Sequence, residues 1–283
     1  MPAAQIHVKR INRRYVCNTE RINRSLLATH TSTLKSPTTT TEVVSSQLIH
    51  ANCAAQTVMS PEEKSNGAEY WRCRWANRII PFHRPSLHPY LREFGDQFRT
   101  SKRELRVFFP MCGKMLEMKW FYEIGHTVIA IEITQQAIDE FFCENNLTAT
   151  ESYCPTTSCK IFQTMDKRLS IYCCDVFDFL SSKPSLMDVV FDRASLCIME
   201  SQVHRQRYAK LMRSVLAPAY TYILITFKHD DQTYKGLPRN VSDCNVTEIF
   251  GENPTLEKVG ELQETTVPNI KGTLTEVIWR MTG

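Results

Sequence analysis

Glycine is scarce in this chain: nine of its 283 residues are glycines. A fold that binds a dinucleotide needs about three of them in the turn after its first strand, because the backbone must approach a pyrophosphate closely there. The turn that would serve, after the apolar run that ends at Phe109, contains only Gly113. The catalytic Tyr/Lys or Ser pattern of nicotinamide-dependent reductases is also missing, so this class of enzyme is disfavoured.

Long apolar runs and a strong charge of one sign are missing as well. No stretch approaches the roughly 20 apolar residues of a membrane-spanning helix. The formal net charge is +4, and residues 1–58 contribute +5 of it, so the rest of the chain totals −1. A nearly neutral folded part argues against a nucleic acid or a membrane surface as the main partner.

Cysteine is plentiful, but its spacing is irregular. The chain has 11 cysteines, and Cys173 and Cys174 are neighbours in an apolar run, where successive side chains point to opposite faces of a strand. Cys154 and Cys159, followed by Cys173, lack the second close pair of a zinc site. We therefore expect no metal site.

The N-terminal 65 residues differ in composition from the rest. Residues 29–46 are mostly Thr and Ser, without the apolar periodicity that could bury a face. The segment before them is rich in Arg and poor in acid, which resembles a mitochondrial transit peptide, and Met59 is an alternative start. We expect residues 1–65 to form a disordered basic tail, with targeting as the alternative, and residues 66–283 to form one domain.

Residues 105–132 contain the motif around which the rest of the chain is organised. The apolar run before Pro110 suits a buried parallel strand. Apolar residues at helical spacing follow, and Gly125 stands where a helix would end. A second apolar run then finishes on Glu132. This pattern predicts one strand–helix–strand unit of an open α/β sheet.

The remaining chain repeats strands and helices and predicts a Rossmann-like α/β fold with helices on both faces of the sheet. Residues 148–168 are polar and irregular, and no element is assigned to them. The last two strands alternate apolar and polar residues, as an antiparallel edge pair would. The sequence thus predicts seven strands, five of them parallel. Further strands are expected at 169–174, 187–191, 220–227, 256–259 and 274–281, and helices at 134–145, 202–216 and 242–251.

Three charged residues stand at strand ends, where such sheets bind ligands. Glu132, about 20 residues past the first turn, is suited to bind the hydroxyls of a ribose. Asp175 could accept from the amine of an adenine, and Arg193 should project between cofactor and substrate. Because the turn offers no cradle for a pyrophosphate, S-adenosylmethionine, which carries none, is favoured over a nicotinamide cofactor.

Aromatic residues precede this core. Trp71 and Trp75 are four residues apart, so on a helix they share one face. With Phe82 they could form a lid over a heterocycle and a sulfonium, since aromatic faces attract cations by roughly 0.5–2 kcal/mol. The alternative is that they only dock an N-terminal helix onto the sheet.

Several segments resemble the thiopurine S-methyltransferase family, across about residues 69–282. The Phe-Phe-Pro-Met-Cys-Gly-Lys run at 108–114 is specific to that family rather than general to methyltransferases. The other matching segments are 117–121, 128–132, 172–174, 177–178, 192–193, the Trp71-x-x-x-Trp75 pair and Phe82-His83.

The resemblance implies a class I methyltransferase fold that moves a methyl group from S-adenosylmethionine to the sulfur of an aromatic or heterocyclic thiol. Arg193 would be catalytic and would touch both cofactor and substrate, and Phe82 would also touch substrate. The cofactor-binding residues would be Trp71, Trp75, Phe82, Met111 at the methionine end, Gly113, Glu132 at the ribose, Asp175 and Val176 at the adenine, and Arg193. We expect a monomer that acts on a small-molecule thiol, without nucleic acid or membrane, in the cytoplasm or, if the tail is a transit peptide, in mitochondria.

The chain departs from the family in places. Its loop after the fifth parallel strand reads Lys-Gly-Leu-Pro-Arg at 235–239, where the family usually has a Pro-Gly-Pro-Pro-Phe-type sequence. A second substrate-side arginine has no counterpart around residues 268–275, and Asp175 replaces a small polar residue. A protein that binds the cofactor without turnover is therefore the main alternative. A nucleic-acid methyltransferase is disfavoured, because no Asn-Pro-Pro-Tyr-like motif is present.

Overall fold

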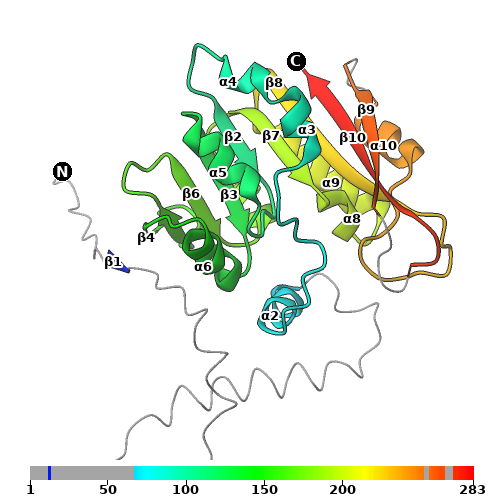
Figure 1. Ribbon diagram of the computed structural model, residues 1–283, viewed down its shortest axis with the longest axis horizontal. Coiled ribbons are helices and arrows are strands. Elements are labelled where there is room, and N and C mark those ends of the chain that lie inside the picture. Colours follow the sequence, from blue (N-terminus) through cyan, green and yellow to red (C-terminus); the bar gives the residue numbers. More distant parts are fainter. Residues whose placement is uncertain (1–11, 14–66, 252–254, 265–269) are drawn as a thin grey trace, which may run out of the picture.

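A single mixed β-sheet organises the protein (Figure 1). The computed structural model describes residues 12–13, 67–251, 255–264 and 270–283. The tail expected to be disordered, residues 1–65, lies outside these residues except for β1 (Asn12–Arg13). This short strand pairs with β4 at one edge of the sheet.

The centre of the sheet is parallel. Its strands lie in the order β6, β3, β2, β7 and β8, and each pairs in parallel with its neighbours. Their central residues are nearly all buried, which is what covered parallel strands require. The five predicted parallel strands are thus confirmed, as β2 (Arg106–Phe109), β3 (Thr127–Glu132), β6 (Leu169–Cys173), β7 (Met187–Arg193) and β8 (Leu216–Lys228).

Antiparallel strands extend the sheet on both sides. Beyond β8 lie β10 (Leu274–Thr282) and β9 (Glu257–Glu264), the predicted C-terminal edge pair. The expected total of seven strands is too low, because the sheet has ten strands among the described residues. Besides β1, the sequence analysis missed β4 (Ala149–Tyr153) and β5 (Lys160–Gln163), a hairpin beside β6. The outer strand β4 is mostly half-exposed and polar, so it carries no apolar signal.

Helices cover both faces and form two hydrophobic cores. One core combines the sheet with four helices that carry the buried side chains of Leu91, Phe98, Phe121 and Phe141. Those helices are α3 (Pro89–Phe94), α4 (Asp96–Arg99), α5 (Leu116–Glu123) and α6 (Gln135–Glu144).

The second core covers the other face. Its helices contribute Phe179, Leu196, Tyr208, Met212 and Phe250, all buried. They are α7 (Val176–Ser181), α8 (Ser195–Ile198), α9 (Gln202–Arg213) and α10 (Asp243–Phe250). None of the helices in the described ranges combines the length and the apolar composition that a membrane crossing requires.

The first helix of the domain, α2 (Ala68–Ala76), stands apart from both layers. Figure 1 shows it below one end of the strands, next to α6. The amide of Gln136 in α6 donates to the carbonyl of Trp75, 3.1 Å away, which ties the two helices together. The helix therefore lies at the end of the sheet rather than on a face.

Candidate active site

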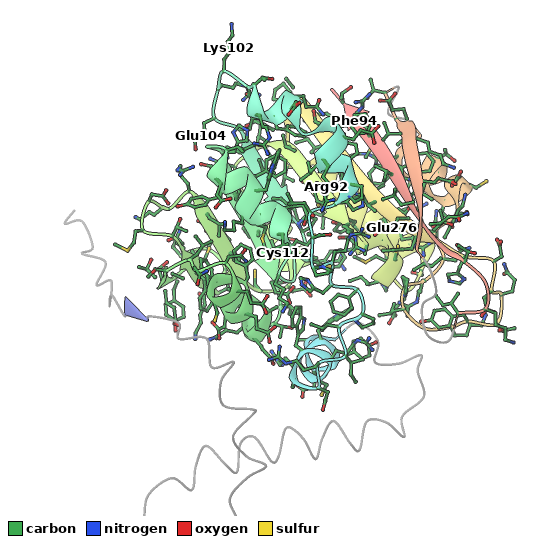
Figure 2. All side chains as sticks on the ribbon, in the orientation of Figure 1. Arg92, Phe94, Lys102, Glu104, Cys112 and Glu276 are labelled. Carbon is green, nitrogen blue, oxygen red and sulfur yellow. The ribbon has the colours of Figure 1, made fainter. Side chains whose placement is uncertain are left out.

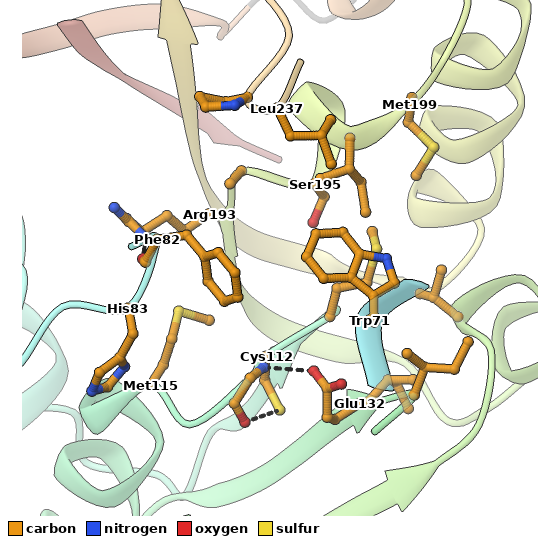
Figure 3. A pocket seen from close by; sticks show the side chains of 18 of the residues that line it. Trp71, Phe82, His83, Cys112, Met115, Glu132, Arg193, Ser195, Met199 and Leu237 are labelled. Carbon is orange, nitrogen blue, oxygen red and sulfur yellow. Dashed lines mark hydrogen bonds between the residues drawn. The ribbon is translucent and has the colours of Figure 1, made fainter. Parts of the chain in front are cut away.

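A cavity of about 380 Å³ opens at the carboxyl ends of the parallel strands. This is where an open α/β sheet is expected to bind its ligand. Every cofactor and substrate residue predicted from the sequence lines this cavity: Trp71, Trp75, Phe82, Met111, Gly113, Glu132, Asp175, Val176 and Arg193. Figure 3 shows several of them around the same space.

The turn after β2 binds the carboxylate at the end of β3. Glu132 accepts from the backbone N–H of Gly113 and from that of Thr134, each at 2.8 Å. Met111 and Gly113 have φ values of 47° and 52°, so this short turn passes through the left-handed region twice. Glu132 is buried, and burial raises its pKa although both N–H groups act to lower it. The carboxylate therefore lies fixed on the cavity wall.

Gly113 is needed for more than its backbone angle. A Cβ at this position would lie 3.4 Å from the indole ring of Trp75. Together with the positive φ, this close approach makes any side chain at residue 113 strained. The single glycine of the turn thus lets α2 settle against the turn, whereas three glycines would be needed for a pyrophosphate.

Three aromatic side chains form a cluster at the cavity. Phe82 meets Trp71 edge-on with ring centroids 5.7 Å apart, and it meets Trp75 at 6.0 Å. Trp75 is only 2% exposed. These aromatics pack α2 against the neighbouring segment and also line the cavity, while their predicted role as a lid over the cofactor stays a prediction.

Ion pairs hold this segment on α6. Arg78, just after α2, pairs with Glu140 at 2.7 Å. Lys114 reaches Glu140 at 2.9 Å and Glu144 at 2.6 Å, and its ammonium lies 5.8 Å from the centroid of the Trp75 ring. Lys114 is 7% exposed, so these pairs compensate a nearly buried charge.

Arg193 is positioned by two elements far apart in the sequence. Its Nε donates to Glu276 in β10 at 2.7 Å, and its Nη1 donates to the carbonyl of Phe82 at 2.9 Å. The guanidinium also lies over the ring of Phe227, 5.1 Å from its centroid. The side chain that the sequence predicted to be catalytic is therefore held rigidly on the wall of the cavity.

Glu276 is the functional residue that the sequence analysis missed. It is completely buried near the middle of the molecule (Figure 2). Besides Arg193, it pairs with Arg84 at 3.1 Å and with Nε2 of His88 at 3.2 Å. Burial acts to raise its pKa, but the His88 hydrogen bond and the charges of Arg193, His88 and Arg84 prevail and lower it to about 2. The available signal was the single carboxylate within β10.

The comparisons with known proteins agree with this geometry. The sequence profile of the family described as Thiopurine S-methyltransferase matches residues 66–281. The chain is 37% identical to thiopurine S-methyltransferase of Rattus norvegicus over 200 residues, which cover 69% of this chain and 82% of the relative. The Bos taurus enzyme is 36% identical over 200 residues, 69% of this chain and 81% of its own. The chain belongs to the thiopurine S-methyltransferase family.

A solved structure that resembles the chain is the 1,6-didemethyltoxoflavin-N1-methyltransferase of Burkholderia thailandensis. It is 12% identical, with a TM-score of 0.49, and the match covers 88% of this chain and 94% of that one.

The family's cofactor, S-adenosylmethionine, fits the residues of this cavity. Its amino-acid and ribose parts are polar, and Glu132 offers a fixed carboxylate there. Its sulfonium is a cation, and the aromatic cluster offers ring faces. It has no pyrophosphate, and the turn has no cradle for one. Among the described residues, no three His, Cys, Asp or Glu side chains are grouped as metal ligands.

Asp175 has a structural task that the sequence did not reveal. Its side chain accepts from the backbone N–H of Phe177 at 2.7 Å and thereby caps α7. Val176 follows at the first helical position and is buried. The predicted contact of Asp175 with an adenine therefore competes with a helix cap that already uses one carboxylate oxygen.

The loop at residues 235–239, where the chain departs from the family, lies beside the cavity. Leu237 and Pro238, from the stretch that departs from the family, both line it. Arg84 lines it as well, next to Arg193, and both arginines pair with Glu276. The cavity wall thus has a further arginine beside Arg193. It comes from the N-terminal segment rather than from the C-terminal strands.

His83 faces the cavity beside these charges (Figure 3). Burial and the positive charge of Lys114 lower its pKa below the usual value, and Arg193 adds to this effect. The imidazole is therefore neutral near pH 7 and can accept a proton.

Asp192, next to Arg193, does not reach the cavity. It is completely buried and accepts from the hydroxyls of Tyr208 at 2.8 Å and Tyr222 at 2.6 Å. Burial raises its pKa. Its role is to join β7, β8 and α9 under the site.

Proposed function

We propose that this protein transfers the methyl group of S-adenosylmethionine to the sulfur of an aromatic or heterocyclic thiol. The observation that carries the proposal is the placement of Glu132 and Arg193 on one cavity under the aromatic cluster. The membership of the thiopurine S-methyltransferase family supports the same activity.

The proposed cofactor-binding roles follow from the chemistry of the side chains that line the cavity. Glu132 accepts from the ribose hydroxyls, since its oxygens retain free lone pairs beyond the two backbone hydrogen bonds. Asp175 and Val176 contact the adenine, whereas Met111 and Gly113 contact the methionine part. Trp71, Trp75 and Phe82 cover the cofactor, and Arg193 completes the set of cofactor-binding residues.

Substrate binding depends on Phe82 and Arg193. When it is bound, S-adenosylmethionine supplies a methyl carbon activated by a positive sulfur. A heteroaryl thiol ionises readily, and its thiolate is a strong nucleophile. Arg193 attracts that thiolate to the cavity, and the aromatic cluster with Leu237 excludes water. Holding the reacting sulfur in line contributes several kcal/mol to catalysis.

Methylation of a panel of thiols tests this function. A thiopurine and a thiophenol should be methylated, and an aliphatic thiol of higher pKa should react more slowly. S-Adenosylhomocysteine should bind in calorimetry, and Glu132→Gln should weaken that binding by about tenfold, the loss of one charge-assisted contact. Binding without turnover on any thiol would instead identify a cofactor-binding protein, and hydride transfer would identify a reductase.

Further aspects of the proposal concern the whole chain. Residues 66–283 form the catalytic domain. The domain works as a monomer on a small-molecule thiol, in the cytoplasm and without nucleic acid. The balanced charge of the chain beyond residue 58 supports the absence of a nucleic-acid partner.

A further inference from the structure

Three cysteines lie in a row across neighbouring strands. In the β4–β5 hairpin, Tyr153 faces Lys160 in the last paired position, so Cys154 and Cys159 are the next pair. On the other side of β5, Lys160 faces Cys173, so the next pair is Cys159 and Cys174. We call Cys154, Cys159 and Cys174 the thiol row.

Hydrogen bonds extend two of these strands by one residue. The N–H of Cys154 donates to the carbonyl of Cys159 at 2.8 Å, which continues the pairing of β4 with β5, and the N–H of Cys174 donates to the carbonyl of Glu132 at 3.2 Å, which continues β6 along β3. Residues opposite each other on adjacent strands point to the same face. The three thiols therefore share one face, and Cys173 points to the other.

The Cys159 and Cys174 thiols are neighbours on this face. Their side chains face each other across β5 and β6, and burial, the largest cause, raises the pKa of Cys174 together with the nearby Cys159. The hydroxyl of Thr157 also donates to Cys159 at 3.0 Å. Opposed residues of antiparallel strands have Cα atoms roughly 4.5–5.5 Å apart, within the range of about 4.4–6.8 Å that a disulfide spans.

All three thiols are reduced and within reach of solvent. Each is free and half-buried rather than enclosed. Cys174 also lines the cofactor cavity, directly before Asp175 and Val176. One end of the thiol row is thus open to small oxidants, and the other end is part of the cavity wall.

We propose that Cys159 and Cys174 form a reversible disulfide that weakens cofactor binding when the thiol pool becomes oxidised. The oxidant is a low-molecular-weight disulfide such as oxidised glutathione. Two protein thiols lose two electrons and two protons, and the oxidised glutathione gains them and leaves as two thiols.

Cys154 provides the entry point. Burial acts to raise its pKa, but hydrogen bonds from Thr157 and Thr156 outweigh this and lower it. Its thiolate attacks oxidised glutathione and releases one glutathione. Cys159 then attacks the sulfur of Cys154 and releases the second, which takes up the proton of Cys159.

The final exchange favours the inner pair. Cys174 attacks the Cys159 sulfur, its proton is released, and Cys154 leaves as a thiolate. Cys154, whose pKa is lowered, is a better leaving group than Cys174, whose pKa is raised, so Cys154 returns to the free state. Oxidation therefore ends on Cys159 and Cys174, next to the cofactor cavity.

The effect on the cofactor rests on the function proposed above. A disulfide fixes the Cys174 side chain toward β5 and thereby restrains the backbone that leads into Asp175 and Val176. We expect the affinity for S-adenosylhomocysteine to fall by about fivefold or more, the usual lower range of coupling between two sites. Because this coupling is reciprocal, saturating S-adenosylhomocysteine must lower the equilibrium constant for disulfide formation by the same factor.

Equilibration of the full-length protein in glutathione redox buffers tests the disulfide. After an acid quench and alkylation of free thiols, peptide mapping should find Cys159 joined to Cys174 in the oxidised buffers. Cys159→Ser should abolish the link, and Cys154→Ser should slow its formation without changing the final yield. Cys244→Ser, which removes an exposed cysteine of α10, is the control and should change neither.

Two results would overturn the disulfide: full alkylation of Cys159 and Cys174 in every buffer, or an end product that joins Cys154 to Cys159. Calorimetry with S-adenosylhomocysteine on reduced and oxidised protein tests the coupling. Equal affinities would overturn the regulation. If the reduced protein binds no S-adenosylhomocysteine, the proposed function fails, and the mapping result still decides the disulfide.

Discussion

At the scale of single residues, the environment of Arg193 limits how it can meet a substrate. Its Nε and Nη2 face Glu276, and its Nη1 donates to Phe82. Each terminal nitrogen keeps one further N–H, because each carries two. A thiolate is therefore met by a guanidinium whose direction is already fixed, and little side-chain entropy is lost on binding.

Replacing Arg193 with alanine tests this role. Glu276 keeps Arg84 and His88 as partners, so the variant should fold. We expect kcat/KM for a thiopurine to fall by about 100-fold, as for the loss of one preorganised donor group. Steady-state kinetics measure it. Arg280→Ala, which removes an arginine of β10 that pairs with Glu257, is the control. Unchanged methylation and cofactor affinity in Arg193→Ala would remove Arg193 from the mechanism.

Glu276 makes a pH-dependent contribution to stability. Its pKa in the folded protein is about 2, below the ordinary value of 4.5, so its contribution is complete above pH 4.5 and is lost as the pH falls toward 2. Between about pH 6 and about pH 3 we expect the loss of on the order of 2 kcal/mol of unfolding free energy from this group. Urea unfolding across that range measures it.

The matched variant is Glu276→Gln, which cannot ionise. Its unfolding free energy should be lower at neutral pH and should change less between these two pH values. An equally steep acid dependence in both proteins would show that another carboxylate is responsible.

At the scale of elements, α2 is attached to the rest of the protein mainly through α6. Arg78 pairs with Glu140, and Gln136 donates to the Trp75 carbonyl. Both contacts are at least partly exposed, so each contributes only about 1 kcal/mol. The helix α2, which we propose covers the cofactor, is thus held on α6 by two weak polar contacts.

Removing both contacts tests this attachment. In the double variant Arg78→Ala and Gln136→Ala, amide hydrogen exchange of residues 68–76 should become about 30-fold faster, since the two contacts together contribute about 2 kcal/mol and about 1.4 kcal/mol corresponds to a factor of ten. Exchange in the central strands should not change. Arg72→Ala, which removes only an ion pair within α2, is the control. Equal exchange in all three proteins would mean that the aromatic cluster alone holds α2.

The elements that could be predicted from the sequence are those with a strong apolar period. The unit β2–α5–β3 follows from its two apolar runs and from Gly125, whose φ is 100°. The hairpin β4–β5 could not be predicted in the same way, because it lies near the sheet edge and buries little apolar surface.

The residues of the candidate site also divide into those that could be predicted from the sequence and those that could not. Residues at the ends of predicted strands, such as Glu132 and Arg193, could be placed at the cavity from topology alone. Glu276 could not, because its role depends on a pairing with a residue 83 positions away. The helix cap made by Asp175 was also missed, since the short α7 gave no periodic signal of its own.

At the scale of the whole molecule, ligand binding at the sheet end should stabilise both cores. The cavity wall includes residues from β3, β7 and α8, so a bound cofactor contacts the parallel sheet and its helices together. S-Adenosylhomocysteine at 100 times its Kd should add about 2.7 kcal/mol to the unfolding free energy.

Differential scanning calorimetry measures this effect. For a domain of this size the added free energy should raise Tm by about 5–10 °C. NADH at the same concentration is the control and should not shift Tm. A shift with NADH and none with S-adenosylhomocysteine would exclude the methyl donor as the natural ligand of the cavity.

The anchoring of Arg193 by Glu276 has a consequence for protein synthesis. The ribosome releases the arginine 83 residues ahead of the glutamate, and β10 must insert between β8 and β9 before the pair can form. A nascent chain that has already completed its parallel strands therefore still lacks the carboxylate that pairs with this guanidinium. Stalled or prematurely terminated products that lack the last strand would be inert, even if they captured the nucleoside.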